Sequence, residues 1–186
     1  MEIKIVPYLS PCYNSLTSET ISDQRFISKM AQNIHLRKIK KADLPSVYEL
    51  VRNTIQVSYA DVYPLEAIEF FKNYHNRENI LKDVASGYTI VAESEGLILG
   101  TGTLLEMNVR RVYIDPQHQH RGIGQLIVKK LEQKAKSERL EKLDLSASLK
   151  SRRFWEAMGF VFVAEYFIPV ANDKKLIYYE MAKTLK

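Results

Sequence analysis

The sequence of 186 residues contains a single cysteine, Cys12. One cysteine excludes an internal disulfide bond and any cysteine-rich zinc site. His118 and His120 have no partners at the spacing of metal ligands, so we expect no metal centre. The length is sufficient for one domain with a sizeable hydrophobic core.

Long hydrophobic runs are also missing. No segment approaches the roughly 20 consecutive apolar residues that a membrane-spanning helix needs. The first residues have neither the basic segment nor the long apolar segment of a signal peptide. We therefore expect a cytoplasmic protein without a membrane partner.

Charge is spread along the chain without any run of five like charges, and no aromatic-plus-basic RNA-binding motif is present. The formal net charge is +5, and residues 1–33 carry three basic and three acidic side chains. The positive excess therefore belongs to residues 34–186. It is either an ordinary solvated surface or an attraction for a phosphate-bearing cofactor. A basic nucleic-acid-binding domain is the less favoured alternative, and we expect no nucleic-acid partner.

The composition and the hydrophobic pattern of the sequence change near residue 34. Residues 9–23 are rich in Ser, Thr, Pro and Asn, so we interpret residues 1–33 as an N-terminal extension with one short helix at 21–30. Residues 34–186 form the main domain. Alternating apolar residues predict strands at 34–39, 88–93, 97–105, 108–114, 143–147, 160–167 and 176–181. Helical spacing predicts helices at 44–55, 68–74, 76–85, 122–138 and 149–158.

The order of these elements predicts an α/β chain with a mixed sheet, in which hairpins come before crossovers. Asp43 is expected to cap the first helix of the domain. Tyr59, Tyr63 and His75 lie in the helical region and are either pocket residues or packing residues.

One segment suggests chemistry. A strand ends near Ile114, a short polar loop follows, and a helix begins at Gly122 and Gly124. The start of a helix exposes about four unpaired N–H groups and carries roughly half a positive charge. Glycines allow a bulky anion to approach the backbone, so this helix start is a candidate pyrophosphate site.

Two common phosphate-binding motifs do not fit this segment. No Lys-Ser/Thr pair follows the second glycine, which excludes a P-loop, and the third glycine of the dinucleotide fingerprint is missing. Taken alone, the two glycines are equally compatible with an ordinary glycine-rich helix start.

A wider pattern is more specific. Residues 119–124 read Gln-His-Arg-Gly-Ile-Gly and resemble the Q/R-x-x-G-x-G/A signature of the GNAT superfamily of N-acetyltransferases. Residues 153–160, Arg-Phe-Trp-Glu-Ala-Met-Gly-Phe, are similar to the F-Y-x-x-x-G-F helix end of that family. Residues 143–148 resemble the strand between these motifs, and the likeness extends over residues 34–183.

The resemblance implies the GNAT fold, α/β or α+β, with a mixed central sheet of six to seven strands and about four flanking helices. Two parallel strands, 108–114 and 143–148, are then splayed, and the pantetheine arm of acetyl-CoA lies between them. The implied cofactor-binding positions are Val112, Tyr113, Ile114, Gln119, His120, Arg121, Gly122, Ile123, Gly124, Gln125, Ser148 and Phe154. Of these, Val112 and Ile114 contribute backbone groups to pantetheine, and the helix start contributes N–H groups to the pyrophosphate.

The catalytic positions depart from the family pattern. Trp155 stands where relatives usually have an acid tyrosine, and an indole N–H donates hydrogen bonds without acting as an acid near neutral pH. Ser148 replaces an asparagine, and Asn108 replaces a glutamate that many relatives use as the base. Glu106, two residues before Asn108, is the best candidate base; its alternative role is a solvated hairpin residue.

The resemblance therefore implies an acetyl-CoA-dependent N-acetyltransferase that acts on a primary amine by direct attack. Because Trp155 replaces the tyrosine, an acyl-CoA-binding module with little or no transferase activity is the alternative. The acceptor is a small-molecule or peptide amine, and the family tendency to dimerise makes a homodimer possible.

Overall fold

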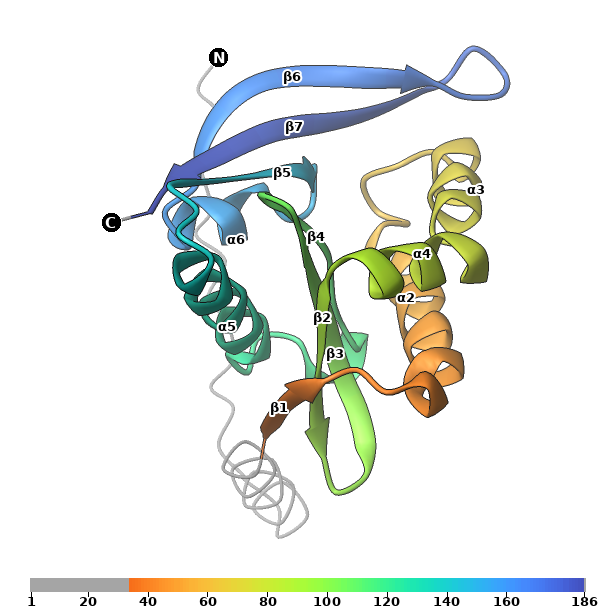
Figure 1. The fold of residues 1–186 in the computed structure, drawn as a ribbon. Helices are drawn as coiled ribbons and strands as arrows, with labels where there is room; N and C mark the ends of the chain where they lie inside the picture. The colour runs from red at the N-terminus through yellow and green to blue at the C-terminus, as the bar shows by residue number, and fades with distance from the viewer. Residues whose placement is uncertain (1–33, 186) are drawn as a thin grey trace, which may run out of the picture. The chain divides into compact units, whose positions relative to one another are not determined.

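The computed structural model describes residues 34–185, which form a seven-stranded sheet with helices on both faces (Figure 1). The predicted N-terminal extension and its short helix lie outside the described residues. The strands are β1 (His35–Lys38), β2 (Tyr88–Ser94), β3 (Leu97–Leu105), β4 (Asn108–Ile114), β5 (Lys142–Ser148), β6 (Val161–Pro169) and β7 (Lys175–Thr184). The helices are α2 (Leu44–Ser58), α3 (Leu65–Tyr74), α4 (Arg77–Ser86), α5 (Ile123–Ser137) and α6 (Arg152–Ala157), with short 3₁₀ turns η1 (Lys41–Asp43) and η2 (Pro116–His118).

The strands lie in the order β1-β2-β3-β4-β5-β7-β6. Every neighbouring pair is antiparallel except β4 and β5, which run parallel. The prediction of a mixed sheet with one parallel pair at these strands is confirmed. Antiparallel hairpins connect β2, β3 and β4, whereas α5 makes the crossover between the parallel strands, as such a connection requires.

Two details of the sequence prediction are wrong. Asp43 stands before α2 without capping it, because its carboxylate accepts the Lys40 N–H at 2.7 Å and pairs with Arg37 at 2.5 Å. The helix expected at 149–158 is shorter, since residues 149–151 form a turn and α6 covers only Arg152–Ala157.

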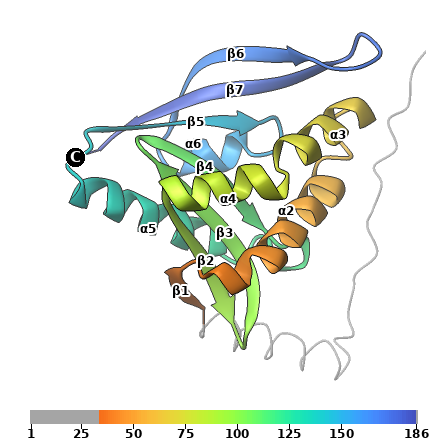
Figure 2. The same ribbon diagram turned by 45° about the vertical axis from the view of Figure 1, so that its right-hand side comes forward.

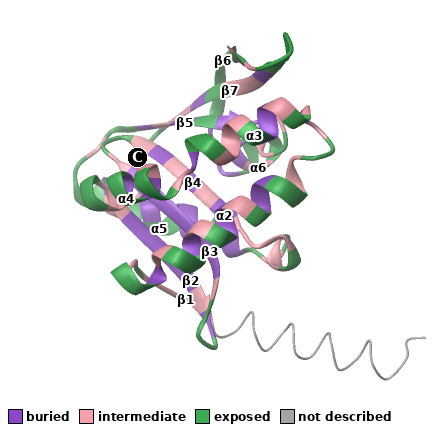
Figure 3. Ribbon diagram, turned by 90° about the vertical axis from the view of Figure 1, so that its right-hand side faces the viewer, coloured by how far each residue is buried: buried purple, intermediate pink, exposed green. Residues whose placement is uncertain are grey.

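The hydrophobic core has two parts, one on each face of the sheet. Alternation along β2 sends Ile90 and Ala92 into the cluster beside α5 and α6, and sends Val91 into the cluster beside α2, α3 and α4. Figure 3 shows the central strands largely buried, with the buried residues of the helices on the sides that face the sheet. The edge strand β6 is exposed over most of its length.

Two glycines in β3 determine how closely α5 approaches the sheet. A Cβ atom on Gly102 would lie 2.5 Å from the Ile127 side chain, and one on Gly100 would lie 2.7 Å from that of Ile114. Both distances are shorter than real Cβ contacts, so any larger residue would push α5 away. The helix therefore rests directly against β3, which fixes its N-terminus beside the end of β4.

A bulge interrupts the pairing of β3 with β4. Thr101 pairs with Tyr113 and Thr103 pairs with Arg110, so β4 has one residue more than β3 between these pairs. Arg111, within the bulge, has φ +54°, which is uncommon for a residue with a side chain. The alternation of side chains changes at this point, with consequences for the cavity described below.

Figure 2 shows α2, α3 and α4 together on one face of the sheet and α5 on the other. None of the helices within residues 34–185 has the length and apolar character needed to cross a membrane.

Candidate active site

The parallel strands β4 and β5 separate almost as soon as they meet. Their only paired residues are Asn108 and Asp144, where the Asn108 Nδ2 donates to Asp144 Oδ1 at 2.7 Å and the Asp144 N–H donates to the Met107 carbonyl at 3.1 Å. Beyond this point β4 pairs with β3 alone and β5 pairs with β7 alone. The cavity residues of the two strands thus face an opening between them, and Figure 1 shows β5 turning away from β4.

The N-terminus of α5 opens toward this gap. Gly122 occupies the N-cap with φ +80°, and a Cβ atom there would meet nothing within 4 Å. Gly124 lies two residues further along, where a Cβ atom would lie 3.2 Å from the ring of Phe154. No side chain of residues 34–185 caps this helix, so its first N–H groups are available to an anion.

Side chains fasten the loop before α5 to the neighbouring elements. The Gln119 Nε2 donates to Ser58 Oγ and to the Ile114 carbonyl, each at 3.1 Å, and Thr54 Oγ1 donates to the same carbonyl at 3.1 Å. The Arg121 guanidinium donates to the Gln117 carbonyl at 2.9 Å. Gln119 and Arg121 are therefore engaged in shaping the loop, and the anion-binding capacity lies in backbone groups.

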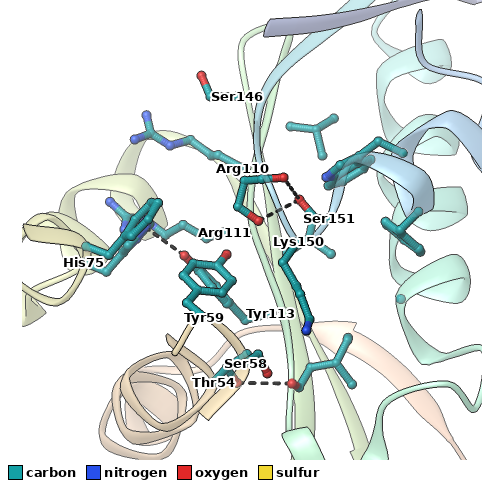
Figure 4. A pocket seen from close by; sticks show the side chains of 18 of the residues that line it. Thr54, Ser58, Tyr59, His75, Arg110, Arg111, Tyr113, Ser146, Lys150 and Ser151 are labelled. Atoms are coloured by element: carbon teal, nitrogen blue, oxygen red, sulfur yellow. Dashed lines mark hydrogen bonds between the residues drawn. The ribbon is translucent and has the colours of Figure 1, made fainter. Parts of the chain in front are cut away.

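A cavity of about 760 Å³ joins the gap between β4 and β5 to the α5 opening and to the space beneath α3 (Figure 4). Most of the predicted site residues line it: Asn108, Val112, Tyr113, Ile114, Gln119, His120, Gly122, Ile123, Gly124, Gln125, Ser148, Phe154 and Trp155. Glu106 and Arg121 do not. The structure thus brings together residues from β4, β5, α5 and α6 that are up to 47 positions apart in the sequence, from Asn108 to Trp155.

Aromatic packing and two serines form the wall at β5 and α6. Trp155 is 6% exposed and makes edge-to-face contacts with Phe154 at 5.0 Å and Phe160 at 5.3 Å between ring centroids. Ser148, at the end of β5, lies 3.0 Å from Ser151 between hydroxyl oxygens. Trp155 therefore belongs both to the hydrophobic core and to the cavity wall.

On the opposite side of the cavity, a buried ionic cluster joins β4 to α4. The bulge directs Arg110 and Arg111 toward the same side, and both guanidinium groups reach Asp83 Oδ2, at 2.9 Å and 2.6 Å. Arg111 also contacts His75 Nδ1 and donates to the Asn79 carbonyl at 3.2 Å. The side chain of Arg111 is only 4% exposed, so Asp83 is its necessary counter-ion.

The hydrogen bonds of this cluster have a fixed direction. Arginine can only donate, so the Nδ1 of His75 must accept from Arg111 and the proton of the neutral ring lies on Nε2. The Nε2–H then donates to the Tyr113 hydroxyl at 2.9 Å, as drawn in Figure 4. The Tyr113 oxygen accepts this bond, and the neighbouring Tyr59 helps to raise the pKa of Tyr113.

Burial reinforces these protonation states. Burial lowers the pKa of His75 well below 6.5, and the charges of Arg111 and Arg110 lower it further. Burial raises the pKa of Tyr113 well above 10. Burial also raises the pKa of Tyr59, against the opposing effect of hydrogen bonding to Ser148 and Tyr113. At neutral pH, His75 is uncharged and both tyrosines keep their protons.

The comparison with known families agrees with this geometry. A family model described as the acetyltransferase (GNAT) domain matches residues 59–185. The chain belongs to the GNAT acetyltransferases. The resemblance expected from residues 119–124 and 153–160 is confirmed.

Solved structures share the GNAT fold with this chain. A GCN5-related N-acetyltransferase from Rhodopseudomonas palustris is 21% identical with a TM-score of 0.76, and the match covers 82% of this chain and 96% of that one. The PaiA N-acetyltransferase from Thermoplasma acidophilum, in complex with coenzyme A, is 19% identical (TM-score 0.68; 82% and 99% covered). YncA from Salmonella typhimurium, with its cofactor acetyl-CoA, is 18% identical (TM-score 0.65; 83% and 95% covered). No curated protein sequence matches this chain.

Glu106 does not occupy the position expected of a GNAT base. It lies in the turn between β3 and β4, has φ +53°, is exposed and lies outside the cavity lining. The prediction assumed that residue 106 keeps the strand parity of Asn108, but residues 106 and 107 form a turn before β4 begins at Asn108. Glu106 is therefore the solvated hairpin residue that was its alternative.

Tyr59 and His75 line the cavity, as one interpretation expected, whereas Tyr63 is buried beneath it and bonds to the backbone of Leu149 and Ile177.

The cluster around Asp83 was missed by sequence reasoning. A signal for it was present, because two consecutive arginines interrupt an otherwise alternating strand at 110 and 111. Such a pair inside a buried strand indicates a bulge with a buried acidic partner.

Proposed function

We propose that the protein is an acetyl-CoA-dependent N-acetyltransferase, in which a primary amine attacks the acetyl thioester directly. The observation that carries the proposal is the gap between β4 and β5, which continues without a break to the uncapped start of α5. The complexes of PaiA with coenzyme A and of YncA with acetyl-CoA support the choice of ligand.

Different cavity residues bind the pantetheine arm and the pyrophosphate of the co-substrate. Backbone groups of Val112 and Ile114 hold the pantetheine arm along the free edge of β4, although the Ile114 carbonyl already accepts two side-chain bonds. Backbone N–H groups at Gly122, Gly124 and Gln125 hold the pyrophosphate. Phe154 closes the opening beside Gly124.

The transfer step forms the carbon–nitrogen bond of the amide and breaks the carbon–sulfur bond of the thioester. The amine must first be neutral, and the described residues that line the cavity include no carboxylate to remove its proton. An α-amine, with a pKa of about 8, loses its proton to water far more readily than a lysine amine with a pKa of about 10.4. The cavity therefore favours an acceptor whose amine is weakly basic.

Tyr59 is the best donor to the departing sulfur. Tyr59 lines the cavity together with Ser148 and with Trp155, the residue of α6 in the usual tyrosine position. The raised pKa of Tyr59 means that it donates a hydrogen bond without losing the proton. A thiolate leaves readily with such help, because the pKa of a free thiol is only about 8.5.

The alternative is an acyl-CoA-binding module of the same fold with little or no transferase activity. Trp155 at the acid position and the carboxylate-free cavity favour it. Release of the CoA thiol from acetyl-CoA across a panel of amines separates the two functions, since binding without release on any amine contradicts the transferase. The cytoplasmic location and the homodimer expected from the sequence remain predictions.

Gly122→Val tests the binding site. The variant places a side chain at the mouth of α5, so we expect the affinity for coenzyme A to fall at least about a hundredfold through the loss of charge-assisted hydrogen bonds. Gly96→Val is the matched control, because Gly96 has φ +81° with equally open surroundings in the β2–β3 turn. Both variants should lose about 1–2 kcal/mol of stability through backbone strain. Equal coenzyme A affinities in calorimetric titrations of the two variants would contradict the proposed site.

A further inference from the structure

The acceptor side of the cavity has a simple composition. Three aromatic residues of α3, Phe70, Phe71 and Tyr74, form one wall, and the apolar side chains of Ile168 and Leu176 on β6 and β7 form another. The charged side chains among the described lining residues are Arg110 and Arg111 of β4 and Lys150, which is paired with the exposed Asp61. Apolar walls with a few polar groups are typical of sites for small molecules.

The two arginines leave an excess of positive charge. Both share the single carboxylate of Asp83, and His75 beside them is neutral. Arg111 is held by three partners and is buried, whereas the side chain of Arg110 is 24% exposed. The bond of Arg110 Nη2 to the Tyr74 hydroxyl, 2.9 Å long, keeps its guanidinium against the aromatic wall.

The hydrogen bonds of Arg110 are incomplete. Its Nε is buried and, although 2.9 Å from Asp83 Oδ2, makes no well-directed hydrogen bond within residues 34–185. A guanidinium group has five donors in a planar fork that matches a carboxylate, so Arg110 retains donors for a ligand. Figure 4 shows Arg110 and Arg111 extending from the same strand on the side of His75.

The phosphates of coenzyme A cannot satisfy this charge if they bind at α5. Arg110 and Ile114 are four residues apart on β4, which is roughly 13 Å along a strand, and the α5 opening lies at the Ile114 end. Arg110 therefore faces the part of the cavity that is left for the acceptor.

We propose that the acceptor is an amine that carries a carboxylate and an apolar or aromatic body, and that Arg110 binds the carboxylate. The inference rests on the proposed transferase function and adds the class of its acceptor. The carboxylate neutralises the excess charge beside Asp83, and the apolar body packs against Phe70 and Tyr74. An acceptor with a second cationic group is repelled, because the lining offers no carboxylate to receive it.

Binding of product analogues tests the inference without requiring turnover. Three ligands are titrated calorimetrically into the full chain saturated with coenzyme A: N-acetylphenylalanine, N-acetylphenylalaninamide and N-acetylglycine. None of them carries a charged amine, so the first two differ only in the carboxylate, and the first and third differ only in the apolar body. We expect N-acetylphenylalanine to bind about tenfold to a hundredfold more tightly than its amide, and more tightly than N-acetylglycine.

Variants then assign the preference to one side chain. Arg110→Gln should bring the affinities for N-acetylphenylalanine and its amide to within about twofold, and Arg110→Lys, which keeps the charge but loses the fork, should reduce the preference only in part. Arg77→Gln is the control for loss of one positive charge, because Arg77 lies exposed on α4 outside the cavity lining; its preference should equal that of the unmodified chain.

Several outcomes overturn the inference. Equal binding of the acid and the amide, no binding of any of the three ligands, or an unchanged preference in Arg110→Gln would each do so. The preceding titration with coenzyme A reports separately on the proposed function: a chain that binds coenzyme A but not N-acetylphenylalanine keeps its function and loses this acceptor class, whereas a chain that does not bind coenzyme A contradicts both.

Discussion

The two sides of β4 make the candidate site in different ways. Toward α5, the site consists of backbone groups, glycines and a helix start, all within residues 112–125. Toward α2, α3 and α4, it consists of side chains from separate parts of the chain: His75, Asp83, Arg111 and Tyr113 are joined through hydrogen bonds and charge, and Tyr59 lines the same cavity. A backbone site is set by local chain geometry, whereas a side-chain site depends on the packing of the whole domain. The difference predicts where substitutions should affect stability and where they should affect chemistry.

The largest expected effect is the loss of stability caused by Asp83→Asn, on the side of β4 where the site is made of side chains. The change leaves the guanidinium of Arg111, 4% exposed, without its counter-ion, which costs about 3–5 kcal/mol in buried pairs. The control is Asp61→Asn, which breaks the exposed pair with Lys150 and should cost at most about 1 kcal/mol. Urea unfolding of both variants measures the difference. If the two losses were similar, the cluster would not hold α4 against β4.

Tyr59→Phe should affect chemistry more than stability. Without the hydroxyl, the sulfur of bound coenzyme A loses a donor, so its thiol pKa should rise and turnover of acetyl-CoA should fall about tenfold. Ultraviolet absorbance of the bound thiolate as a function of pH gives the thiol pKa without any acceptor. Tyr178→Phe is the control, since Tyr178 lines the same cavity but takes no part in the bonds to His75. An identical thiol pKa in the Tyr59→Phe variant and the unmodified chain would exclude Tyr59 as the donor.

His75 should make the stability of the protein depend on pH, and this effect should be smaller than those of the two preceding substitutions. Its pKa is lowered in the folded protein by burial beside Arg111 and Arg110, with Tyr113 and Tyr74 packed around it. Below pH 6.5 the unfolded chain therefore binds a proton that the folded chain does not, and stability falls as the pH decreases, by up to about 1.4 kcal/mol per pH unit.

The measurement for His75 is urea unfolding between pH 5 and pH 8. His75→Gln should be less stable at pH 8 but should show a flatter dependence on pH, because the suppressed protonation is removed. His35→Gln, at an exposed position on β1, should keep the slope of the unmodified chain. A slope unchanged by His75→Gln would assign the pH dependence to other groups.

The contrast also explains what could be predicted from the sequence. The bounds of β3 and β4 agree with the sequence prediction, and α5 differs by one residue at each end, because alternation, helical spacing and glycines are local signals. The loop from Gln119 to Gly124 was recognised for the same reason.

The remaining features depend on contacts that sequence spacing does not contain. Asp83 and Arg111 are 28 residues apart, and their pairing requires α4 to pack beside a bulged strand. The prediction for Glu106 failed because it extended the alternation of β4 into a turn. Asp43 does not cap α2, because its carboxylate pairs with the guanidinium of Arg37 in β1 instead.

The single extra residue in β4 opposite Gly102 has a consequence for how such an enzyme diversifies. Under the proposed function, it places positions 110 and 111 beside the acceptor and positions 112 and 114 beside the co-substrate, although all four are neighbours on one strand. Natural or laboratory evolution can therefore alter the choice of acceptor by mutating Arg110 without disturbing the machinery that delivers the acetyl group. A deletion of one residue in this strand would remove that independence, because every side chain beyond it would exchange faces.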